Sequence, residues 1–249
     1  MKRIAKLTLL VACFVVAIAV SCAAGERLLR HEQFVVNTYN TGDFKLVFEQ
    51  QTADLYVDES DLPGVARALG DLRDDIERVT GLLPEVKKSQ ADLGKYAVIA
   101  GTIGHSEVID ALIAADRLDI DSIVGKWEAY VIQVVANPLP NVDTGLVIAG
   151  SDRRGTIYGI YEISRQIGVS PWYFWADVTP EKQDTLVVQN GIYKQGEPSV
   201  KYRGIFLNNE APSLSTWVQR FGGFNHRFYE HVFELLLRLR ANFLWPAMW

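Results

Sequence analysis

The chain has 249 residues, of which 49% are hydrophobic, 11% aromatic and 22% charged. This composition is that of a globular protein with enough apolar material for one large domain or two ordinary ones. The net charge is −5. Three of the basic residues, Lys2, Arg3 and Lys6, are at the N-terminus, so the rest of the chain is more acidic still. No basic block is present, which makes nucleic acid and an anionic membrane surface poor partners.

The N-terminus has the pattern of an export signal. Basic residues 1–6 precede an apolar stretch, residues 7–20, that has the length of a signal-peptide core and is short for a membrane span. Cleavage after Ala23 or Ala24 gives a soluble exported protein. Alternatively, the sequence AVSC ending at Cys22 resembles a bacterial lipobox, in which Cys22 carries a lipid. Both routes stay open, and a buried N-terminal helix is the structural alternative.

Both cysteines, Cys13 and Cys22, lie within residues 1–24, which we assign to a signal peptide or lipoprotein leader. The remaining chain therefore has no disulfide and no thiol nucleophile. An exported protein without disulfides suits a bacterial periplasm or cell surface. Membrane association is expected only through a lipid on Cys22.

Residues 25–197 alternate between strand and helix patterns, which indicates a compact α/β domain. We predict a long helix over residues 62–80, with Asp61 as its N-cap, Pro63 in its first turn and Gly81 just beyond its end. The other predicted helices cover residues 106–115 and 156–167. The predicted strands cover residues 44–49, 53–58, 96–103, 127–135, 145–149 and 185–188.

The stretch GEPS at residues 196–199 interrupts this alternation, and we place a domain boundary there. Beyond it the sequence predicts a strand over residues 202–208, a helix over residues 228–240 and a strand over residues 241–245. Strand, long loop, helix and strand form one parallel βαβ unit. We expect the apolar face of this helix and the edges of the two strands to lack neighbours and to favour aggregation.

The first strand of this unit ends in Asn208, Asn209 and Glu210. In parallel α/β folds, groups at the carboxyl ends of strands line the active site. A glutamate there can transfer a proton or bind a substrate hydroxyl, and the amides can bind sugar hydroxyls or carboxylates. The structural alternative is a glutamate that caps the following turn or pairs with an arginine.

Two tryptophans, Trp245 and Trp249, flank Pro246 at the end of the second strand. Large aromatic faces at such a rim can stack on sugar rings. The alternative is that they fill the interior of the fold as core.

The turn DRRG at residues 152–155 opens a predicted helix after a strand. Positive side chains and free backbone amides at that place suit an anionic ligand, which makes Arg154 a candidate substrate contact. No P-loop signature accompanies the turn, and an inter-domain salt bridge is the structural alternative.

His226 and His231 are five residues apart, which is not the spacing of a helical metal pair, so we expect structural or polar-surface roles and no metal site. No Gly-x-Ser-x-Gly motif points to a serine hydrolase.

Three segments of the C-terminal region resemble glycoside hydrolase family 115, the xylan α-1,2-glucuronidases that remove (4-O-methyl)glucuronic acid side chains. They are RGIFLNNEAP at residues 203–212, FGGFNH at residues 221–226 and FELLLRLRANFLWPAMW at residues 233–249. The earlier stretch GSDRRGTIYG at residues 150–159 is similar to the family's N-terminal domain. The resemblance implies an accessory α/β domain over residues 25–197. Residues 198–249 then form the first βαβ unit of a (β/α)8 TIM barrel, here incomplete.

The resemblance also implies an inverting glycosidase without a cofactor, acting on glucuronoxylan or glucuronoxylo-oligosaccharides. Glu210 matches a family position at the end of the first barrel strand and is the candidate catalytic residue. The candidate substrate contacts are Asn208, Asn209, Arg154, Trp245 and Trp249. The family more often has aspartate at the position of Asn209, and an asparagine cannot act as a base.

An inverting enzyme needs an acid and a base about 6.5–9.5 Å apart, and eight βα units need about 250 residues. We therefore expect the N-terminal part of a longer enzyme, compatible with a homodimer at full length, and no glucuronidase turnover by this chain alone. One alternative is a non-catalytic carbohydrate-binding module or surface lipoprotein remnant. Another is a phosphate-ligand domain that uses Arg153 and Arg154.

Overall fold

The computed structural model describes residues 32–246, so the predicted leader with Cys22, and also Trp249, lie outside the described residues. Every element named below lies within Val35–Trp249, one of the two units into which the chain divides. Within residues 32–246, no helix is long and apolar enough to cross a membrane.

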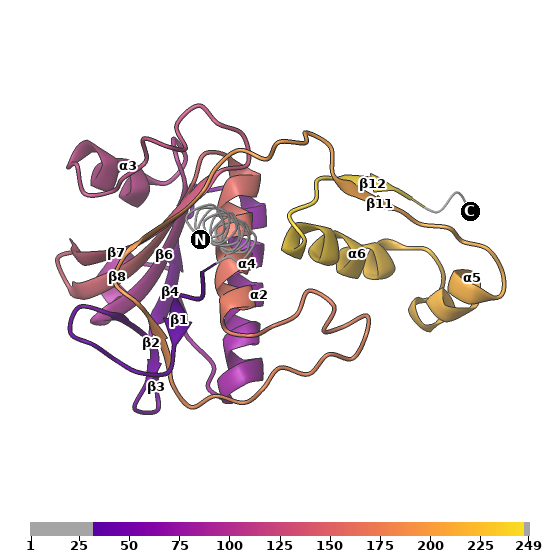
Figure 1. Cartoon of the computed structure of the whole chain (residues 1–249), viewed down its shortest axis with the longest axis horizontal. Coiled ribbons are helices and arrows are strands. Elements are labelled where there is room, and N and C mark those ends of the chain that lie inside the picture. Colours follow the sequence, from indigo (N-terminus) through magenta and orange to yellow (C-terminus); the bar gives the residue numbers. More distant parts are fainter. Residues whose placement is uncertain (1–31, 247–249) are drawn as a thin grey trace, which may run out of the picture. The chain divides into compact units, whose positions relative to one another are not determined.

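A mixed six-stranded sheet is the centre of the N-terminal α/β part (Figure 1). Its middle strands are parallel, and the antiparallel strands β7 and β10 extend it at one edge. The central strands β6 and β8 are almost fully buried, because helices cover both faces of the sheet. In spatial order the strands are β10 (Ile192–Gln195), β7 (Tyr130–Leu139), β8 (Val142–Gly150), β6 (Tyr96–Thr102), β4 (Asp54–Val57) and β5 (Val86–Lys87).

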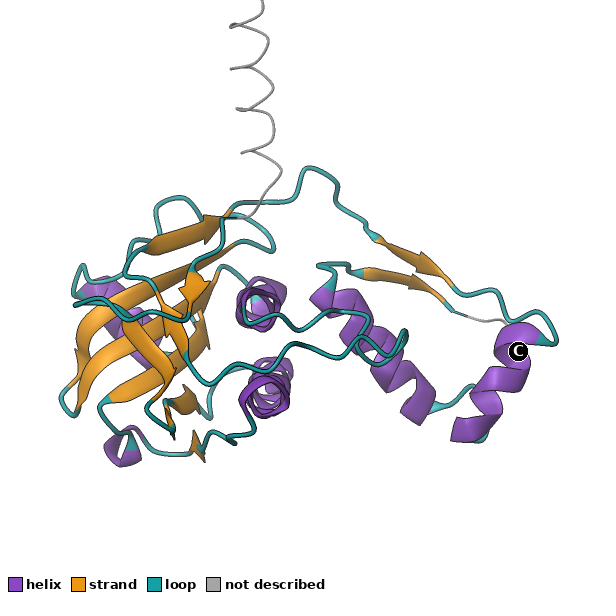
Figure 2. Ribbon diagram, turned by 60° about the horizontal axis from the view of Figure 1, so that its bottom comes forward, coloured by secondary structure: helices purple, strands orange, loops and turns teal. Residues whose placement is uncertain are grey.

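Helices α2 (Pro63–Thr80) and α4 (Arg153–Gln166) lie side by side on one face of this sheet, and α3 (Glu107–Ala114) covers the other (Figures 1 and 2). The apolar residues of α2 recur at helical spacing and are buried on one side only: Val65, Leu69, Leu72, Ile76 and Val79. The predicted helix over residues 62–80 is thereby confirmed. The alternation of strands and helices confirms the α/β class.

The ends of α2 differ in how well the sequence predicted them. Pro63 stands at the first helical position, and Gly81 ends the helix in the left-handed conformation with φ 80°, as predicted. Asp61, however, is not the N-cap, and that prediction is wrong. Leu62 occupies the cap position, while the Asp61 carboxylate accepts a hydrogen bond from the backbone of Thr102 at 2.6 Å. The carboxylate is thus used by the end of the neighbouring strand β6.

Helix α4 begins three residues earlier than predicted, at Arg153, because Asp152 caps it by accepting from the Gly155 amide at 2.8 Å. Almost all of α4 is buried, since the sheet covers one side and the C-terminal helix covers the other. Gly155 is required for this packing. A Cβ atom there would lie 2.2 Å from the carbonyl oxygen of Ala129, at the start of β7.

A second, antiparallel sheet was not predicted. It contains the predicted strands over residues 44–49 and 185–188 together with two strands of only two residues, too short to show a periodic pattern. In spatial order its strands are β1 (Val35–Val36), β9 (Leu186–Val188), β2 (Phe44–Phe48) and β3 (Gln51–Thr52). Strand β10 of the main sheet was also missed, because its side chains alternate at an exposed edge.

The C-terminal unit, residues 198–246, contains the predicted parallel βαβ arrangement. Strand β11 (Gly204–Phe206) pairs in parallel with β12 (Phe243–Trp245), and α6 (His226–Arg238) connects them. Each element is somewhat shorter than predicted. The long loop also folds, into α5 (Ser213–Trp217) and a 3-10 turn over Val218–Phe221.

Helix α6 does not lack neighbours, so that part of the aggregation prediction is wrong. Its buried side chains include Val232, Leu235 and Leu236. One side of α6 packs against α4, and another packs against Ile205 and Leu244 of the two strands (Figure 1). The C-terminal unit is therefore attached to the N-terminal α/β part through α6.

Candidate functional site

The two strands β11 and β12 have one covered face and one open face. Ile205 and Leu244 pack toward α6. Successive side chains of a strand point to opposite faces, so the neighbouring positions lie on the other side, and they are indeed exposed. We call this side the open face; it consists of Gly204, Phe206, Phe243 and Trp245.

Two aromatic side chains form a pair on the open face. Phe206 and Trp245 are in direct register, and their ring centroids are 5.6 Å apart in an edge-to-face arrangement. Each is 58% exposed. The alternative that Trp245 fills a core therefore does not hold within the described residues. An exposed indole at a strand end is available to a ligand, and its role as a substrate contact stays a prediction.

The chain continues from β11 into the predicted polar residues with the same alternation of exposure. Leu207 packs toward α6, and its amide donates to the Trp245 carbonyl at 2.9 Å, which extends the strand pairing by one bond. Asn208 and Glu210 are exposed, whereas Asn209 is half-buried. The Asn208 side-chain oxygen accepts a hydrogen bond from the Glu210 backbone amide at 3.2 Å. The Asn208 side chain thus stabilises the turn that leads to Glu210.

Glu210 differs from the other two glutamates of the C-terminal unit. Glu230 forms an ion pair with Arg67 of α2 at 2.5 Å. Glu234 is buried, and it accepts from Arg238 at 2.8 Å and from the Tyr173 hydroxyl at 2.9 Å. Both therefore face the N-terminal α/β part, and Glu210 has no ion-pair partner among residues 32–246.

Gly204 makes the close approach of the two strands feasible. A Cβ atom at this position would lie 1.8 Å from the Phe243 carbonyl oxygen and 2.5 Å from its carbon, so no side chain fits. The glycine of the RGIF motif is therefore required by the backbone of the neighbouring strand.

Arg154 lies elsewhere, at the start of α4, where its Nε donates to Glu128 at 2.5 Å. Glu128 also binds Arg203 of the C-terminal unit at 2.5 Å, so Arg154 is part of an ion cluster that joins the two parts of the chain. Arg154 itself pairs within the N-terminal α/β part, and the salt bridge to the C-terminal unit is made by Arg203 on the same carboxylate. A substrate contact by Arg154 stays a prediction.

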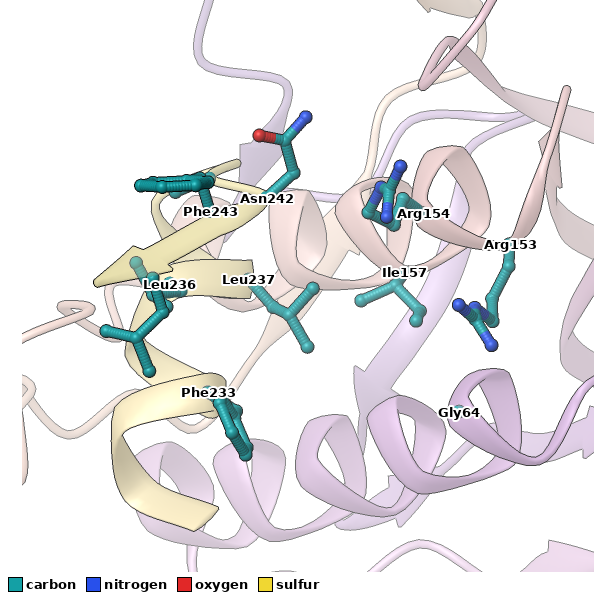
Figure 3. Close-up of a pocket in the computed structure, with 11 residues that line it drawn as sticks. Gly64, Arg153, Arg154, Ile157, Phe233, Leu236, Leu237, Asn242 and Phe243 are labelled. Atoms are coloured by element: carbon teal, nitrogen blue, oxygen red, sulfur yellow. The ribbon is translucent and has the colours of Figure 1, made fainter. Parts of the chain in front are cut away.

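A cavity of about 420 Å³ lies beside this cluster, between α2, α4 and the C-terminal unit (Figure 3). Figure 3 shows Arg153 and Arg154 on α4 across from the apolar side chains of α6. Asn208, Asn209 and Glu210 do not line this cavity, so the structure does not bring Arg154 together with them there. The lining residues include Ile157, Phe233, Leu237, Asn242 and Phe243.

Carboxylates of the chain itself fill the positions at the strand ends where α/β proteins commonly bind anions. Asp152 caps α4, as described above. At α3, the Asp58 carboxylate accepts from the Val108 amide at 3.1 Å and from the Ser106 hydroxyl. A second anion at either helix start would meet a negative charge.

His226 and His231 were predicted to have structural or polar-surface roles. Within the described residues, no group of three or more side chains could hold a metal ion. His226 is exposed at the first turn of α6. His231 stacks on Phe174 with ring centroids 3.9 Å apart, at the edge of an aromatic cluster around Phe228.

The most extensive polar feature was missed by sequence reasoning: three buried carboxylates of the N-terminal α/β part each bind an arginine of the C-terminal unit. Asp75 binds Arg238 at 2.7 Å, and Glu162 binds Arg240 at 2.5 Å. The third is the Glu128–Arg203 pair. In addition, the Tyr158 hydroxyl donates to the Ala241 carbonyl at 3.0 Å, and burial raises the pKa of Tyr158 to about 12, so this donor keeps its proton.

Known proteins resemble this chain at two levels. Residues 195–249 match the model of glycosyl hydrolase family 115. The chain is also similar to the solved structure of BtGH115A, a family GH115 4-O-methyl-α-glucuronidase with specificity for decorated arabinogalactans. The sequence identity is 39% and the TM-score 0.69, over 83% of this chain and 26% of that chain. This chain thus spans about a quarter of that enzyme's length.

Two hexosaminidases show a weaker likeness on which nothing further rests. The Streptomyces plicatus β-hexosaminidase has 15% identity and a TM-score of 0.43, over 81% of this chain and 30% of that chain. The GH20 enzyme of Streptomyces coelicolor A3(2) has 14% identity and a TM-score of 0.43, over 81% and 31%. A search of curated proteins found no match.

Proposed function

We propose, from the relationship of this chain to the α-glucuronidases of glycoside hydrolase family 115, that the open face of its C-terminal unit forms one side of a site for glucuronic acid side chains of polysaccharides. One observation carries the proposal. The parallel strands place an exposed aromatic pair, Phe206 and Trp245, on one face of the sheet. The exposed Glu210 follows at the same end of β11. Aromatic faces, amides and a carboxylate are the groups that bind and cleave sugars.

The roles follow from the chemistry of each group. Glu210 is the proposed acid or base, because it is the carboxylate of the unit that no arginine neutralises. Asn208 and Trp245 are the proposed substrate contacts: the amide for hydroxyls or the uronic carboxylate, and the indole for the apolar face of a sugar ring. Asn209 can bind substrate but cannot take a proton from water, so it is not proposed as the base.

The substrate that we propose is glucuronoxylan or its oligosaccharides, cleaved with inversion in the complete enzyme. The similar enzyme BtGH115A has specificity for decorated arabinogalactans. The test below therefore uses two saccharides that carry glucuronic acid, one derived from xylan and one from arabinogalactan. Inversion needs two carboxylates, with room for a water molecule between them. The C-terminal unit offers one on its open side, so we propose that the chain alone binds without turnover.

Export fits this substrate, because polymeric xylan is outside the cell. The basic and apolar pattern of residues 1–20 supports the proposal of a periplasmic or cell-surface protein. Lipidation at Cys22 is the alternative to release after cleavage.

Binding and release measured side by side test the proposal. The purified protein is titrated with a glucuronoxylo-oligosaccharide and with a glucuronic-acid-decorated arabinogalactan oligosaccharide, and binding is followed by calorimetry. We expect binding without release of glucuronic acid. Trp245→Ala should weaken the affinity by about fivefold to about 150-fold, in keeping with a stacking contact of about 1–3 kcal/mol by analogy with stacked bases.

Glu210→Gln and Glu230→Gln form a matched pair of variants. Only the first should weaken binding of the saccharide, because Glu230 is paired with Arg67 on the other side of the unit. Release of glucuronic acid by the wild-type chain would contradict the proposed lack of turnover. Equal effects of the two glutamine variants on binding would contradict the assignment of Glu210 to the site.

A non-catalytic carbohydrate-binding module is the second candidate, favoured by the exposed Phe206–Trp245 pair. It predicts that Glu210→Gln leaves binding unchanged while Trp245→Ala abolishes it. A phosphate-binding function for Arg153 and Arg154 is not supported, because Asp152 caps the helix and Glu128 already binds Arg154.

A further inference from the structure

Glu128 is a buried carboxylate in an unusual backbone conformation. Its side chain has no exposed surface, and its φ angle is 55°, in the left-handed region that few residues other than glycine adopt. It stands just before β7, facing the start of α4. A conformation of this kind persists only where the surrounding structure enforces it.

Hydrogen bonds to the turn after β8 enforce this conformation. The Glu128 amide donates to the Asp152 carboxylate at 2.9 Å, and the Ala129 amide donates to the Ser151 hydroxyl at 3.1 Å. In return, the Ser151 amide donates to the Ala129 carbonyl at 2.9 Å. Since Asp152 also caps α4, the position of Glu128 is tied to both the sheet and the helix.

The side chain of Glu128 binds three groups. Arg154 Nε and Asn242 Nδ2 donate to Oε1, at 2.5 and 2.8 Å, and Arg203 Nη2 donates to Oε2 at 2.5 Å. Arg203 is the residue directly before β11, and Asn242 is the residue directly before β12. One carboxylate therefore contacts the amino ends of both strands.

The two strand starts are also bonded to each other. The Arg203 amide donates to the Asn242 side-chain oxygen at 3.0 Å, and the amides of Asn242 and Phe243 donate to the Arg203 carbonyl at 2.8 and 3.0 Å. With Glu128 these groups form a closed network, in which the alignment of β11 against β12 is fixed at one end. The other end of the same strands carries Trp245 and leads to Glu210.

We propose that Glu128 is a positioning residue for the candidate site: it aligns the amino ends of β11 and β12, and so sets the placement of the groups at their carboxyl ends. The link to a sugar site rests on the proposed function, whereas the alignment itself does not. Glu128 does not touch the open face, so it is not a catalytic residue.

The effect of losing Glu128 should be local, because other contacts keep α6 in place. Asp75 still binds Arg238, and Glu162 still binds Arg240. Replacing the carboxylate by an amide leaves the partly exposed Arg154 and Arg203 without their counter-charge, and it puts an NH2 donor against their own donors in place of an acceptor. The strands should then separate from the cluster while the helix stays docked.

Amide hydrogen exchange in the 249-residue protein tests this. The Phe243 amide, bonded to Arg203, reports the amino end of the strand pair, and the Leu207 amide, bonded to Trp245, reports the carboxyl end. In Glu128→Gln we expect both to exchange at least tenfold faster. Amides of α6, such as that of Leu239, and those of β6 should change less than threefold.

Glu230→Gln is the matched control, because Glu230 also pairs with an arginine across the two parts of the chain but is exposed. It should leave all these amides within twofold of wild type. A spectroscopic signature comes from 5-fluorotryptophan at Trp245, assigned with Trp245→Phe. Its fluorine resonance should shift or broaden under native conditions in Glu128→Gln, which a mere loss of overall stability would not cause.

If Glu128→Gln does not fold, Glu128→Asp decides, since it keeps the negative charge but its shorter side chain cannot reach Arg154, Arg203 and Asn242 together. It should accelerate exchange at Phe243 at least tenfold. Unchanged exchange at Phe243 and Leu207, or acceleration spread equally over β6, would overturn the proposal. If the strands loosen as expected but the wild-type protein binds no glucuronic acid saccharide, the proposed function fails and the positioning role of Glu128 stands.

Discussion

The two sides of the C-terminal unit contrast in chemistry. The side toward the N-terminal α/β part is held by buried ion pairs, among them Arg238 with Asp75, in which the arginine is only 3% exposed. The open face is aromatic and exposed, with Phe206 and Trp245 in contact with each other. Charge is thus buried where the unit is attached, and apolar surface is exposed where it is not.

This difference indicates separate tasks for the two sides. Buried ion pairs add little net stability over apolar packing, but each tolerates only one geometry, so they define how the unit is oriented. Exposed aromatic surface does not require a single orientation of its partner. It is available to bind a sugar or to pack against another protein segment. The variants that follow compare the two sides directly.

The largest expected difference is between two aromatic residues of the same unit. Phe228 is fully buried in the aromatic cluster beneath α6, whereas Trp245 is mostly exposed. Phe228→Ala should lower the free energy of unfolding by about 4 kcal/mol, and Trp245→Ala by less than about 1 kcal/mol. Urea denaturation followed by circular dichroism measures both. Similar losses would mean that Trp245 is buried in solution.

The next contrast concerns arginine. Arg238→Met should cost about 3 kcal/mol, because the buried Glu234 loses its arginine, Asp75 keeps only Arg78, and the guanidinium leaves its place near the Tyr161 and Tyr173 rings. Arg67→Met removes ion pairs with Glu230 and Asp71 in which the arginine is 53% exposed, and should cost at most about 1 kcal/mol because Asp71 keeps its hydrogen bond from the Tyr161 hydroxyl. Equal losses in the urea midpoint would remove the distinction between the two pairs.

Acid should weaken the attached side through Glu162. Burial raises the pKa of Glu162, but the hydrogen bond from Arg165 and the charges of Arg240 and Arg165 outweigh it, so the pKa lies below its ordinary value of 4.5. The folded state thus releases this proton more readily than the unfolded state. Glu162 therefore contributes stability above pH 4.5 that is lost as the pH falls through the lower folded pKa.

The pH dependence is measured as a difference between two proteins. The unfolding free energy of wild type should fall more steeply between pH 5 and pH 3 than that of Glu162→Gln. Parallel curves for the two would show that Arg165 and Arg240 do not hold the carboxylate in its charged form.

The smallest effect on stability is expected on the open face. The double variant Phe206→Ser with Trp245→Ser should change the unfolding free energy by less than about 1 kcal/mol, since both side chains are exposed. It should nevertheless reduce self-association in sedimentation velocity, because contiguous apolar surface and strand edges promote it. Unaltered self-association would assign the contact to another surface.

Sequence reasoning predicted the elements whose patterns are local. The helical spacing from Val65 to Val79 predicted α2, and the order of strand, long loop, helix and strand over residues 202–245 predicted the parallel pairing of β11 with β12. The resemblance to family 115 was confirmed, while the roles of Asn208, Asn209, Glu210, Trp245 and Trp249, and the boundary near residues 196–199, stay predictions.

The failures that concern polar residues have a shared cause, which is that the partner of the polar group is distant in the chain. Asp61 looks like a helix cap until Thr102, 41 residues away, takes its carboxylate. Arg238 and Arg240 look like the solvated side of a helix end, and Glu162 like a surface residue of α4. Only the docking of α6 onto α4 shows that these charges meet and are buried.

Gly204 has a consequence for how the two strands find each other during folding. If β11 slid along β12 by two residues, the faces would be preserved but Tyr202 or Phe206 would stand opposite the Phe243 carbonyl, where the structure leaves room only for a hydrogen atom. A slide by one residue would bring Arg203 or Ile205 to that place and reverse the faces. Because only glycine fits opposite the Phe243 carbonyl, misaligned pairings are sterically excluded and the native pairing is not.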